Sequence, residues 1–180
     1  VFAGVNVTHP CKQAVLPFLS DLSEHARAIG SVNTVVFEGD RRVGHNTDCY
    51  GFKQSFIEHI PGAALGRVVQ LGAGGAGAAT AYSVLELGAR ELIIVDTIHD
   101  RARSLAKRLT ALFSRPVHAA QDLSAALGGA DGLVHATPTG MSGHPGCAVP
   151  ASLLRADLWV AEVAYFPLET ELVRMAKRIG

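Results

Sequence analysis

Hydrophobic and polar residues alternate in a strand–helix rhythm from about residue 67 onward. Apolar runs of strand length, such as "RVVQL", "ELIIVD", "DGLVHAT" and "LWVAEVAY", are separated by segments with the 3.6-residue period of helices, such as "DRARSLAKRLTALF" and "ETELVRMAKRI". Short apolar strands that alternate with helices are typical of a parallel sheet covered on both faces. The pattern therefore predicts an α/β fold with a doubly wound parallel sheet in this part of the chain.

The beginning of the chain has a less regular pattern. Residues 3–7 are expected to form a short strand, followed by a helix over about residues 10–19. Thr8 is a good N-cap for this helix and Pro10 suits its first position, so Lys12 would lie in the first turn.

A hairpin and another helix complete this smaller α/β region. "SVNTVVFE" and "RRVGHN" flank Gly39 and Asp40, as expected for a β-hairpin that follows a short helix between Ser23 and Gly30. A helix from about residues 50–59 then ends before "PG". We place a domain boundary near residues 60–65.

Composition limits the class of protein. The chain has 180 residues, 48% of them hydrophobic, and 16 basic side chains balance 16 acidic ones. This balance gives no reason to expect nucleic acid or an anionic membrane as a partner, and no apolar run reaches the roughly 18–20 residues of a membrane span. Three scattered cysteines, Cys11, Cys49 and Cys147, fit neither a disulfide framework nor a zinc site. We therefore expect no metal centre and a cytoplasmic location.

A glycine-rich segment follows the first apolar strand of the larger region. Gly72, Gly74 and Gly77 form the pattern G-x-G-x-x-G, with Gly75 and Ala76 between the last two, and an alanine-rich helix follows. In this context the first glycine allows a tight turn, the second lets the backbone approach a pyrophosphate, and the third permits close helix–strand packing. The segment predicts a dinucleotide-binding loop in a Rossmann-like domain; a glycine-rich turn without a ligand is the alternative.

Asp96, at the end of the next strand, bears on the choice of dinucleotide. A carboxylate at this place accepts hydrogen bonds from the adenosine ribose hydroxyls and repels a 2′-phosphate, so it favours NAD over NADP. Arg101 and Arg103 on the following helix could oppose this preference by binding such a phosphate. The alternative role of Asp96 is to cap the next turn.

Six segments occur in the order "GVNVTHPCK", "VNT", "HNTDCYGF", "GAGGAG", "ATPTGM" and "YFPLETEL". Together they resemble the shikimate dehydrogenase family, and within it most closely the NAD-dependent quinate/shikimate dehydrogenases. The resemblance runs over essentially the whole chain. It implies a substrate domain over residues 1–62, a dinucleotide-binding Rossmann-like domain over 63–180, and a cleft between them. It also implies hydride transfer between a nicotinamide cofactor and a hydroxyl or ketone of a cyclic polyol carboxylic acid.

The resemblance assigns roles to residues of the smaller region. By similarity, Lys12 and Asp48 are the catalytic pair beside the reacting oxygen, and Thr8 and Asn33 are ligands of substrate hydroxyls. The chemistry agrees, because alcohol oxidation needs a proton acceptor and a lysine amine oriented by a carboxylate can serve. From the residues alone, Lys12 and Asp48 could equally be surface residues, Thr8 only an N-cap, and Asn33 only a polar residue of the hairpin.

Strand ends of the larger region supply further candidates. Thr137 and Met141 follow one strand end and are expected to flank the nicotinamide, because ligands lie at the carboxyl ends of strands in open parallel sheets. Tyr165 follows another strand end and is a candidate to line the substrate site, with buried packing as the alternative. His135 stands where the family often has asparagine, and no role is assigned to it.

Two departures from the family pattern are informative. NADP-dependent members usually carry Asn-Arg-Thr after the second strand, whereas this chain has Asp96-Thr97-Ile98, which again favours NAD. The family holds the substrate carboxylate with an N-terminal hydroxyl pair, and a glutamine comes from a C-terminal helix; neither segment is in this chain. The chain opens at Val1 without methionine and closes on "RMAKRIG", so we expect it to be part of a longer protein.

The leading hypothesis is an NAD-preferring quinate/shikimate dehydrogenase that acts on a small molecule. A biosynthetic NADP-dependent shikimate dehydrogenase is the closest alternative, and turnover with each cofactor separates the two. A dinucleotide-binding module that senses redox state without catalysis is an alternative of another class. The sequence leaves a homodimer open.

Overall fold

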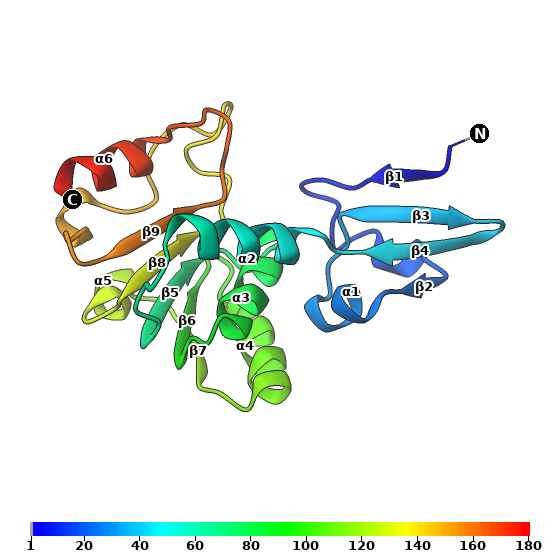
Figure 1. Cartoon of the computed structure of the whole chain (residues 1–180), viewed down its shortest axis with the longest axis horizontal. Coiled ribbons are helices and arrows are strands. Elements are labelled where there is room, and N and C mark those ends of the chain that lie inside the picture. The colour runs from blue at the N-terminus through cyan, green and yellow to red at the C-terminus, as the bar shows by residue number, and fades with distance from the viewer. Residues whose placement is uncertain (1) are drawn as a thin grey trace.

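Two β-sheets form the framework of the protein, one in each half of the chain (Figure 1). The computed structural model describes residues 2–180. Helix α2 (Asp48–His59) runs from the smaller, N-terminal sheet to the larger one. Residues 60–66 connect α2 to the first strand of the larger sheet, and the boundary expected near residues 60–65 falls within this connection. None of the helices in residues 2–180 has the length and apolar character that a membrane span requires.

The N-terminal sheet has four strands in the order β1-β3-β4-β2. β3 pairs with both β1 and β4 in antiparallel fashion, and β2 pairs with β4 in parallel. The expected hairpin is confirmed, because β3 and β4 are joined by the two residues Gly39 and Asp40. The strands are β1 (Gly4–Asn6), β2 (Asp21–Leu22), β3 (Thr34–Glu38) and β4 (Arg41–His45).

Helix α1 (Glu24–Ile29) covers this sheet and begins and ends where the sequence predicts. The Ser23 hydroxyl accepts the N–H of Ala26 at 3.3 Å, and Gly30 ends the helix in the left-handed conformation with φ of 67°.

The helix expected over residues 10–19 is wrong. The chain instead forms consecutive turns and then a short 3₁₀ helix, η1 (Leu16–Phe18). Pro17 explains the difference, because proline lacks an N–H and its ring clashes inside a helix but is tolerated at the start, the place it takes in η1. Lys12 therefore lies in a turn, and Thr8 caps no α-helix.

The larger sheet has five parallel strands in the order β7-β6-β5-β8-β9, which confirms the doubly wound sheet. Its strands are β5 (Arg67–Leu71), β6 (Glu91–Val95), β7 (Val117–Ala120), β8 (Gly132–His135) and β9 (Trp159–Glu162).

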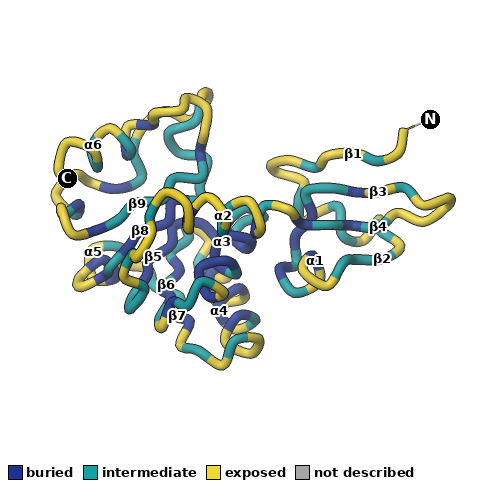
Figure 2. The backbone as a smooth tube through the Cα atoms, in the orientation of Figure 1, coloured by how far each residue is buried: buried dark blue, intermediate teal, exposed yellow. Residues whose placement is uncertain are grey.

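Helices cover both faces of this sheet, and a core fills the space on each side (Figures 1 and 2). Alternate residues of β5 enter different cores: Val68 packs with α3 and α4, and Val69 packs on the other face with α5 and α6. The helices are α3 (Gly75–Glu86), α4 (His99–Phe113), α5 (Leu123–Leu127) and α6 (Glu171–Ile179), and a 3₁₀ helix, η2 (Ala151–Leu153), precedes β9.

Helix α2 packs on the larger half of the molecule. The Ser83 hydroxyl on α3 donates to the carbonyl oxygen of Cys49 at 2.9 Å, and the rings of Phe56 and Trp159 meet edge to face with centroids 4.9 Å apart. Because α2 begins in the N-terminal half, these contacts fix its first turn close to α3.

The direction of the strand order reverses between β5 and β8. At such a switch point the loops after neighbouring strands diverge, and ligands of doubly wound sheets bind there. The loops in question are the glycine loop, defined as residues 72–77 after β5, and the β8 loop, defined as residues 136–141 after β8.

Candidate active site

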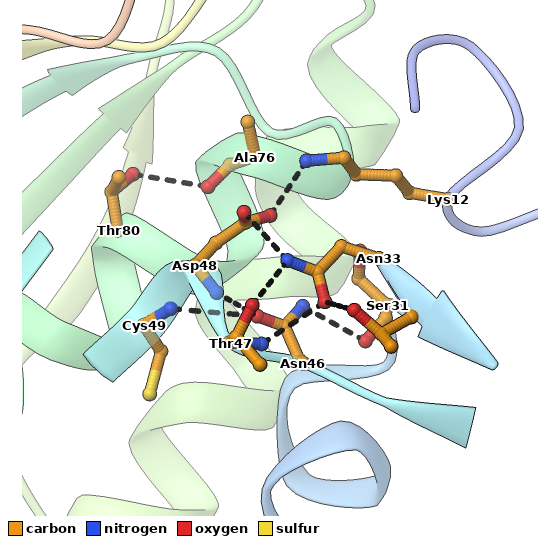
Figure 3. Close-up of polar contacts among 10 residues, drawn as sticks. Lys12, Ser31, Asn33, Asn46, Thr47, Asp48, Cys49, Ala76 and Thr80 are labelled. Atoms are coloured by element: carbon orange, nitrogen blue, oxygen red, sulfur yellow. Dashed lines mark hydrogen bonds and ion pairs between the residues drawn. The ribbon is translucent and has the colours of Figure 1, made fainter. Parts of the chain in front are cut away.

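A lysine and an aspartate from distant parts of the chain form an ion pair (Figure 3). The Nζ atom of Lys12 lies 2.6 Å from the Oδ2 atom of Asp48, although the residues are 36 positions apart. The side chains are 17% and 31% exposed, so the pair is shielded on most sides yet reachable by a ligand. The structure thus brings together the two residues that the sequence nominates for catalysis.

Asn33 holds the carboxylate of this pair (Figure 3). Its Nδ2 atom donates to Asp48 Oδ1 at 2.8 Å and to Thr47 Oγ1 at 2.8 Å, and its Oδ1 atom accepts the Thr47 N–H at 3.0 Å. Asp48 therefore has one oxygen on Lys12 and the other on Asn33. Two strong contacts to one carboxylate fix its orientation.

Asn46, which sequence reasoning missed, positions the start of α2. Its side chain is buried; Nδ2 donates to the Ser31 carbonyl oxygen at 2.9 Å, and Oδ1 accepts the Asp48 N–H at 3.0 Å and the Cys49 N–H at 3.4 Å. The amide thus replaces the side-chain cap that Thr47 does not provide. The signal was an Asn two residues before a helix start, which is typical of an Asx turn.

Lys12 reaches Asp48 by passing over the first turn of α3. The Lys12 carbonyl oxygen accepts the Val32 N–H at 2.8 Å, which anchors its backbone to the N-terminal half. A Cβ atom added to Gly75 would lie 2.6 Å from Lys12 Cβ and 2.9 Å from Ser31 Oγ. Gly75 is therefore required by contact with the N-terminal half, a reason that the sequence motif did not suggest.

The other three glycines of the loop have distinct surroundings. Gly72 has φ of 99°, and a Cβ on it would lie 2.5 Å from the Ala136 carbonyl oxygen. A Cβ on Gly77 would lie 2.2 Å from the Gly72 carbonyl oxygen, so helix and strand approach closely there. A Cβ on Gly74 would meet no atom within 4 Å, and Gly74 caps α3 without a side-chain hydrogen bond.

These features fit the phosphates of a dinucleotide. The open space above Gly74 admits a ligand to the backbone, and the uncapped first turn of α3 offers N–H groups, including those of Gly75 and Ala76, at the positive end of the helix dipole.

Gln70 braces the glycine loop from inside the sheet. This fully buried side chain donates from Nε2 to the carbonyl oxygens of Gly72 at 2.8 Å and Gly77 at 2.7 Å, and its Oε1 atom accepts the Thr80 hydroxyl at 2.9 Å. The sequence signal for this role is a glutamine inside an apolar strand, because a buried side-chain amide must find hydrogen-bond partners.

Asp96 joins the glycine loop to the segment after β6. Its Oδ2 atom accepts the Ala73 N–H at 2.7 Å and its Oδ1 atom accepts the Ile98 N–H at 2.8 Å. The capping role that the sequence left open is therefore present. A carboxylate oxygen has two lone pairs, so each oxygen keeps acceptor capacity for a ribose hydroxyl.

An open cavity of about 310 Å³ lies between Ala73 of the glycine loop, α4 and the N-terminal half. Its lining residues are Gln13, Ala73, Asp100, Arg101, Ser104, Leu105 and Arg108. Arg101 thus faces the cavity, whereas Arg103 pairs with Asp100 at 3.7 Å and is absent from the lining. Arg108 donates to the Ile29 carbonyl oxygen across the two halves, and burial lowers the pKa of its guanidinium.

The remaining candidates make no side-chain hydrogen bond to the ion pair within residues 2–180. Thr137 and Met141 are half-buried in the β8 loop. Thr8 is exposed, and Tyr165, after β9, is 75% exposed. Within residues 2–180, no side-chain hydrogen bond joins Thr8 or Tyr165 to the Lys12–Asp48 pair, and no three His, Cys, Asp or Glu side chains gather as metal ligands.

The parallel sheet, the glycine loop at its switch point and the smaller sheet beside it define a two-part, Rossmann-like α/β protein. A family model described as the shikimate dehydrogenase substrate binding domain matches residues 1–35. The chain is similar to proteins of the shikimate dehydrogenase family.

Relatives and solved structures extend this likeness over the whole chain. A shikimate dehydrogenase (NADP(+)) of Streptomyces avermitilis is 56% identical over 99% of this chain and 62% of the relative. A quinate/shikimate dehydrogenase (NAD(+)) of Corynebacterium efficiens is 45% identical over 99% of this chain and 64% of the relative. The structure of quinate dehydrogenase from Corynebacterium glutamicum in complex with NAD has a TM-score of 0.89 and 44% identity over 99% of this chain and 65% of that one. The chain thus spans 62% to 65% of the length of these proteins.

Proposed function

We propose that the protein containing this chain is an NAD(P)-dependent dehydrogenase that acts on a CH–OH group of a cyclic polyol carboxylic acid, such as shikimate or quinate. The observation that carries the proposal is the 2.6 Å contact between Lys12 and Asp48 next to the first turn of α3. The relatives named above for shikimate and quinate support the substrate class.

We assign the proton transfer of the reaction to the side-chain amine of Lys12. When bound, a nicotinamide dinucleotide supplies or accepts the hydride. In the reductive direction the Lys12 ammonium donates a proton to the substrate oxygen, and in the oxidative direction the neutral amine takes it back. Asp48 orients the amine and offsets the charge of the ammonium form, while Asn33 keeps the carboxylate in place. We also propose that Asn33 and Thr8 contact substrate hydroxyls, and that Tyr165 lies near the substrate.

NAD is the proposed preferred cofactor. Asp96 places a negative charge beside the glycine loop, where it would repel a 2′-phosphate. The relatives include both NAD(+) and NADP(+) enzymes, so the choice needs a direct test. Turnover should be compared with both cofactors on quinate and on shikimate, and a strong preference for NADP would contradict the assignment to Asp96.

The function is tested by Lys12→Ala in the full protein that contains this chain. Loss of a positioned acid–base group lowers turnover by about 10²- to 10⁴-fold, whereas the affinity for NADH should be unchanged. Lys53→Ala is the matched control, because Lys53 pairs with Glu86 at 2.9 Å away from the site. Equal loss of turnover in both variants, or wild-type binding of NADH without any turnover on polyol acids, would contradict the proposal.

A further inference from the structure

A buried histidine–glutamate pair lies at the carboxyl ends of β8 and β9, and the proposed proton transfer does not use it. His135 and Glu162 are directly opposite in the strand register, and their side chains are 1% and 5% exposed. The Nδ1 atom of His135 lies 2.9 Å and 3.0 Å from the two carboxylate oxygens. Burying such polar groups costs desolvation energy that an apolar pair would avoid, so the pair calls for a further reason.

On one side, Glu162 ties down the segment that follows β9. Its Oε1 atom accepts the Ala164 N–H at 3.0 Å, and its Oε2 atom accepts the Thr170 hydroxyl at 3.0 Å. The Thr170 hydroxyl oxygen also accepts the Val173 N–H at 3.3 Å as the N-cap of α6. Glu162 is therefore held by the Ala164 backbone and the Thr170 side chain as well as by His135.

On the other side, His135 reaches the β8 loop. A carboxylate only accepts hydrogen bonds, so Nδ1 carries the hydrogen that Glu162 receives, and in the neutral imidazole Nε2 is an acceptor. In that form the Thr137 hydroxyl, 2.5 Å from Nε2, is the donor, and its oxygen accepts the Thr139 N–H at 3.3 Å. The imidazole thus links the rigid end of the sheet to the loop.

The β8 loop in turn lies against the glycine loop. A Cβ atom added to Gly72 would lie 2.5 Å from the Ala136 carbonyl oxygen and 3.1 Å from Thr137 Cγ2. A dinucleotide whose phosphates lie at the glycine loop, with its adenosine toward Asp96 after β6, places its nicotinamide on the β8 side, because β5 lies between β6 and β8.

We propose that His135 is a positioning residue which, anchored by Glu162, fixes Thr137 and with it the β8 loop beside the nicotinamide half of the dinucleotide. This inference rests on the proposed function, because it takes a nicotinamide dinucleotide as the ligand. The consequence is selective: loss of the link weakens binding of the nicotinamide half and leaves the adenosine half unaffected.

The test compares two ligands in the full protein, NADH by its fluorescence on binding and ADP-ribose by calorimetry. His135→Leu should raise the Kd for NADH by about 3- to 10-fold, the range for loss of one hydrogen bond. The Kd for ADP-ribose, which lacks nicotinamide, should change less than about 2-fold, a difference well under one hydrogen bond.

Two further variants separate the two hydrogen bonds of the imidazole, the one to Glu162 and the one to Thr137. The side-chain amide of His135→Gln takes the place of Nε2 and should restore most of the NADH affinity through Thr137. The amide of His135→Asn takes the place of Nδ1. It keeps only the hydrogen bond to Glu162 and should not restore the affinity for NADH. If His135→Leu does not fold, Thr137→Val removes only the hydroxyl and should give the same selective loss.

Arg155→Ala is the control for a general loss of stability. Arg155 donates to the carbonyl oxygens of Leu127 at 3.0 Å and Ala130 at 2.7 Å, at the opposite end of β8. This variant should lower Tm without changing the ratio of the two Kd values. The inference is overturned if His135→Leu and Thr137→Val leave NADH binding unchanged, or weaken both ligands equally. Failure of the wild-type protein to bind NADH or NADPH would instead overturn the proposed function.

Discussion

Lys12 passes so closely over Gly75 that a Cβ atom on the glycine would lie 2.6 Å from Lys12 Cβ, a separation that real Cβ atoms essentially never show. Lys12 belongs to the N-terminal half and Gly75 to the first turn of α3 in the larger half. The ion pair and the glycine loop are therefore packed against each other, so a change in the glycine loop should alter the position of Lys12.

Gly75→Ala should displace Lys12 and lower kcat. The added methyl group overlaps the lysine stem and Ser31 Oγ, so the Lys12 amine must move relative to Asp48. A displacement of about 1 Å at a reacting group costs about 10²-fold in rate. Gly74→Ala is the matched variant, since its methyl group meets no protein atom within 4 Å but occupies the space open to a pyrophosphate.

The two glycine variants should give opposite signatures. Steady-state kinetics should show the loss in kcat for Gly75→Ala, and fluorescence titration should show a raised Kd for NADH for Gly74→Ala. Similar profiles for the two variants would mean that Lys12 is not held by its contact with Gly75.

Asn33→Ala should lower turnover by releasing Asp48. The change removes the donor to Asp48 Oδ1 and the acceptor of the Thr47 N–H. A hydrogen bond to a charged group contributes about 1.5–3 kcal/mol. We expect kcat/KM to fall by about 10-fold, which corresponds to the lower end of that range. Initial rates on quinate and shikimate would measure the loss, and an unchanged kcat/KM would show that Lys12 alone fixes Asp48.

Asn46→Ala should destabilise the protein more than any exposed asparagine. Three hydrogen bonds of a buried amide are lost, one to Ser31 and two at the start of α2, which we expect to lower the free energy of unfolding by about 1–3 kcal/mol. Asn6→Ala on exposed β1 is the control and should stay within about 0.5 kcal/mol. Urea unfolding measures both, and equal effects would contradict the role of Asn46.

Much of the fold could be predicted because the relevant signals are local. The parallel strands and the glycine loop were read from apolar runs and glycine spacing, which depend on neighbouring residues alone. The helix expected over residues 10–19 does not form, because Pro17 lacks an N–H and its ring clashes inside a helix, which overrides the surrounding pattern.

The candidate site depended on contacts that no local pattern encodes. Lys12 and Asp48 are 36 residues apart, and only the family resemblance placed them together. His135 and Glu162 were missed for a similar reason: their pairing depends on the order and register of β8 and β9, which the alternation of strands and helices does not specify.

Iodoacetamide should modify Cys11 before the other two cysteines. Cys11 is exposed, whereas burial raises the pKa of the Cys49 and Cys147 thiols. A raised pKa leaves less thiolate at any pH below it, so alkylation of Cys49 and Cys147 should become appreciable only as the pH rises further. Mass spectrometry of the labelled peptides at pH 7.5, a value at which an ordinary thiol is only about 10% ionised, measures the order.

Labelling of Cys11 should also inactivate the enzyme, because the adduct is attached next to Lys12. Cys11→Ser should then keep its activity in the presence of iodoacetamide. Inactivation of Cys11→Ser at the wild-type rate would show that a different cysteine is responsible.

Asp96→Asn should shift the cofactor preference toward NADP, because it removes a negative charge and keeps one acceptor for the Ala73 N–H. Like charges at short range are a strong means of rejecting a ligand, and we expect the ratio of kcat/KM for NADP to that for NAD to rise by about 10-fold or more. Arg101→Ala should act in the opposite direction, since Arg101 lines the cavity next to the glycine loop and is a candidate partner for a 2′-phosphate. Arg103→Ala is the control, because the Arg103 side chain, which pairs with Asp100 at 3.7 Å, does not itself line that cavity and its loss should leave the ratio unchanged. If Asp96→Asn lowers kcat/KM for both cofactors equally, the carboxylate acts only by holding the glycine loop, and the preference for NAD must have another source.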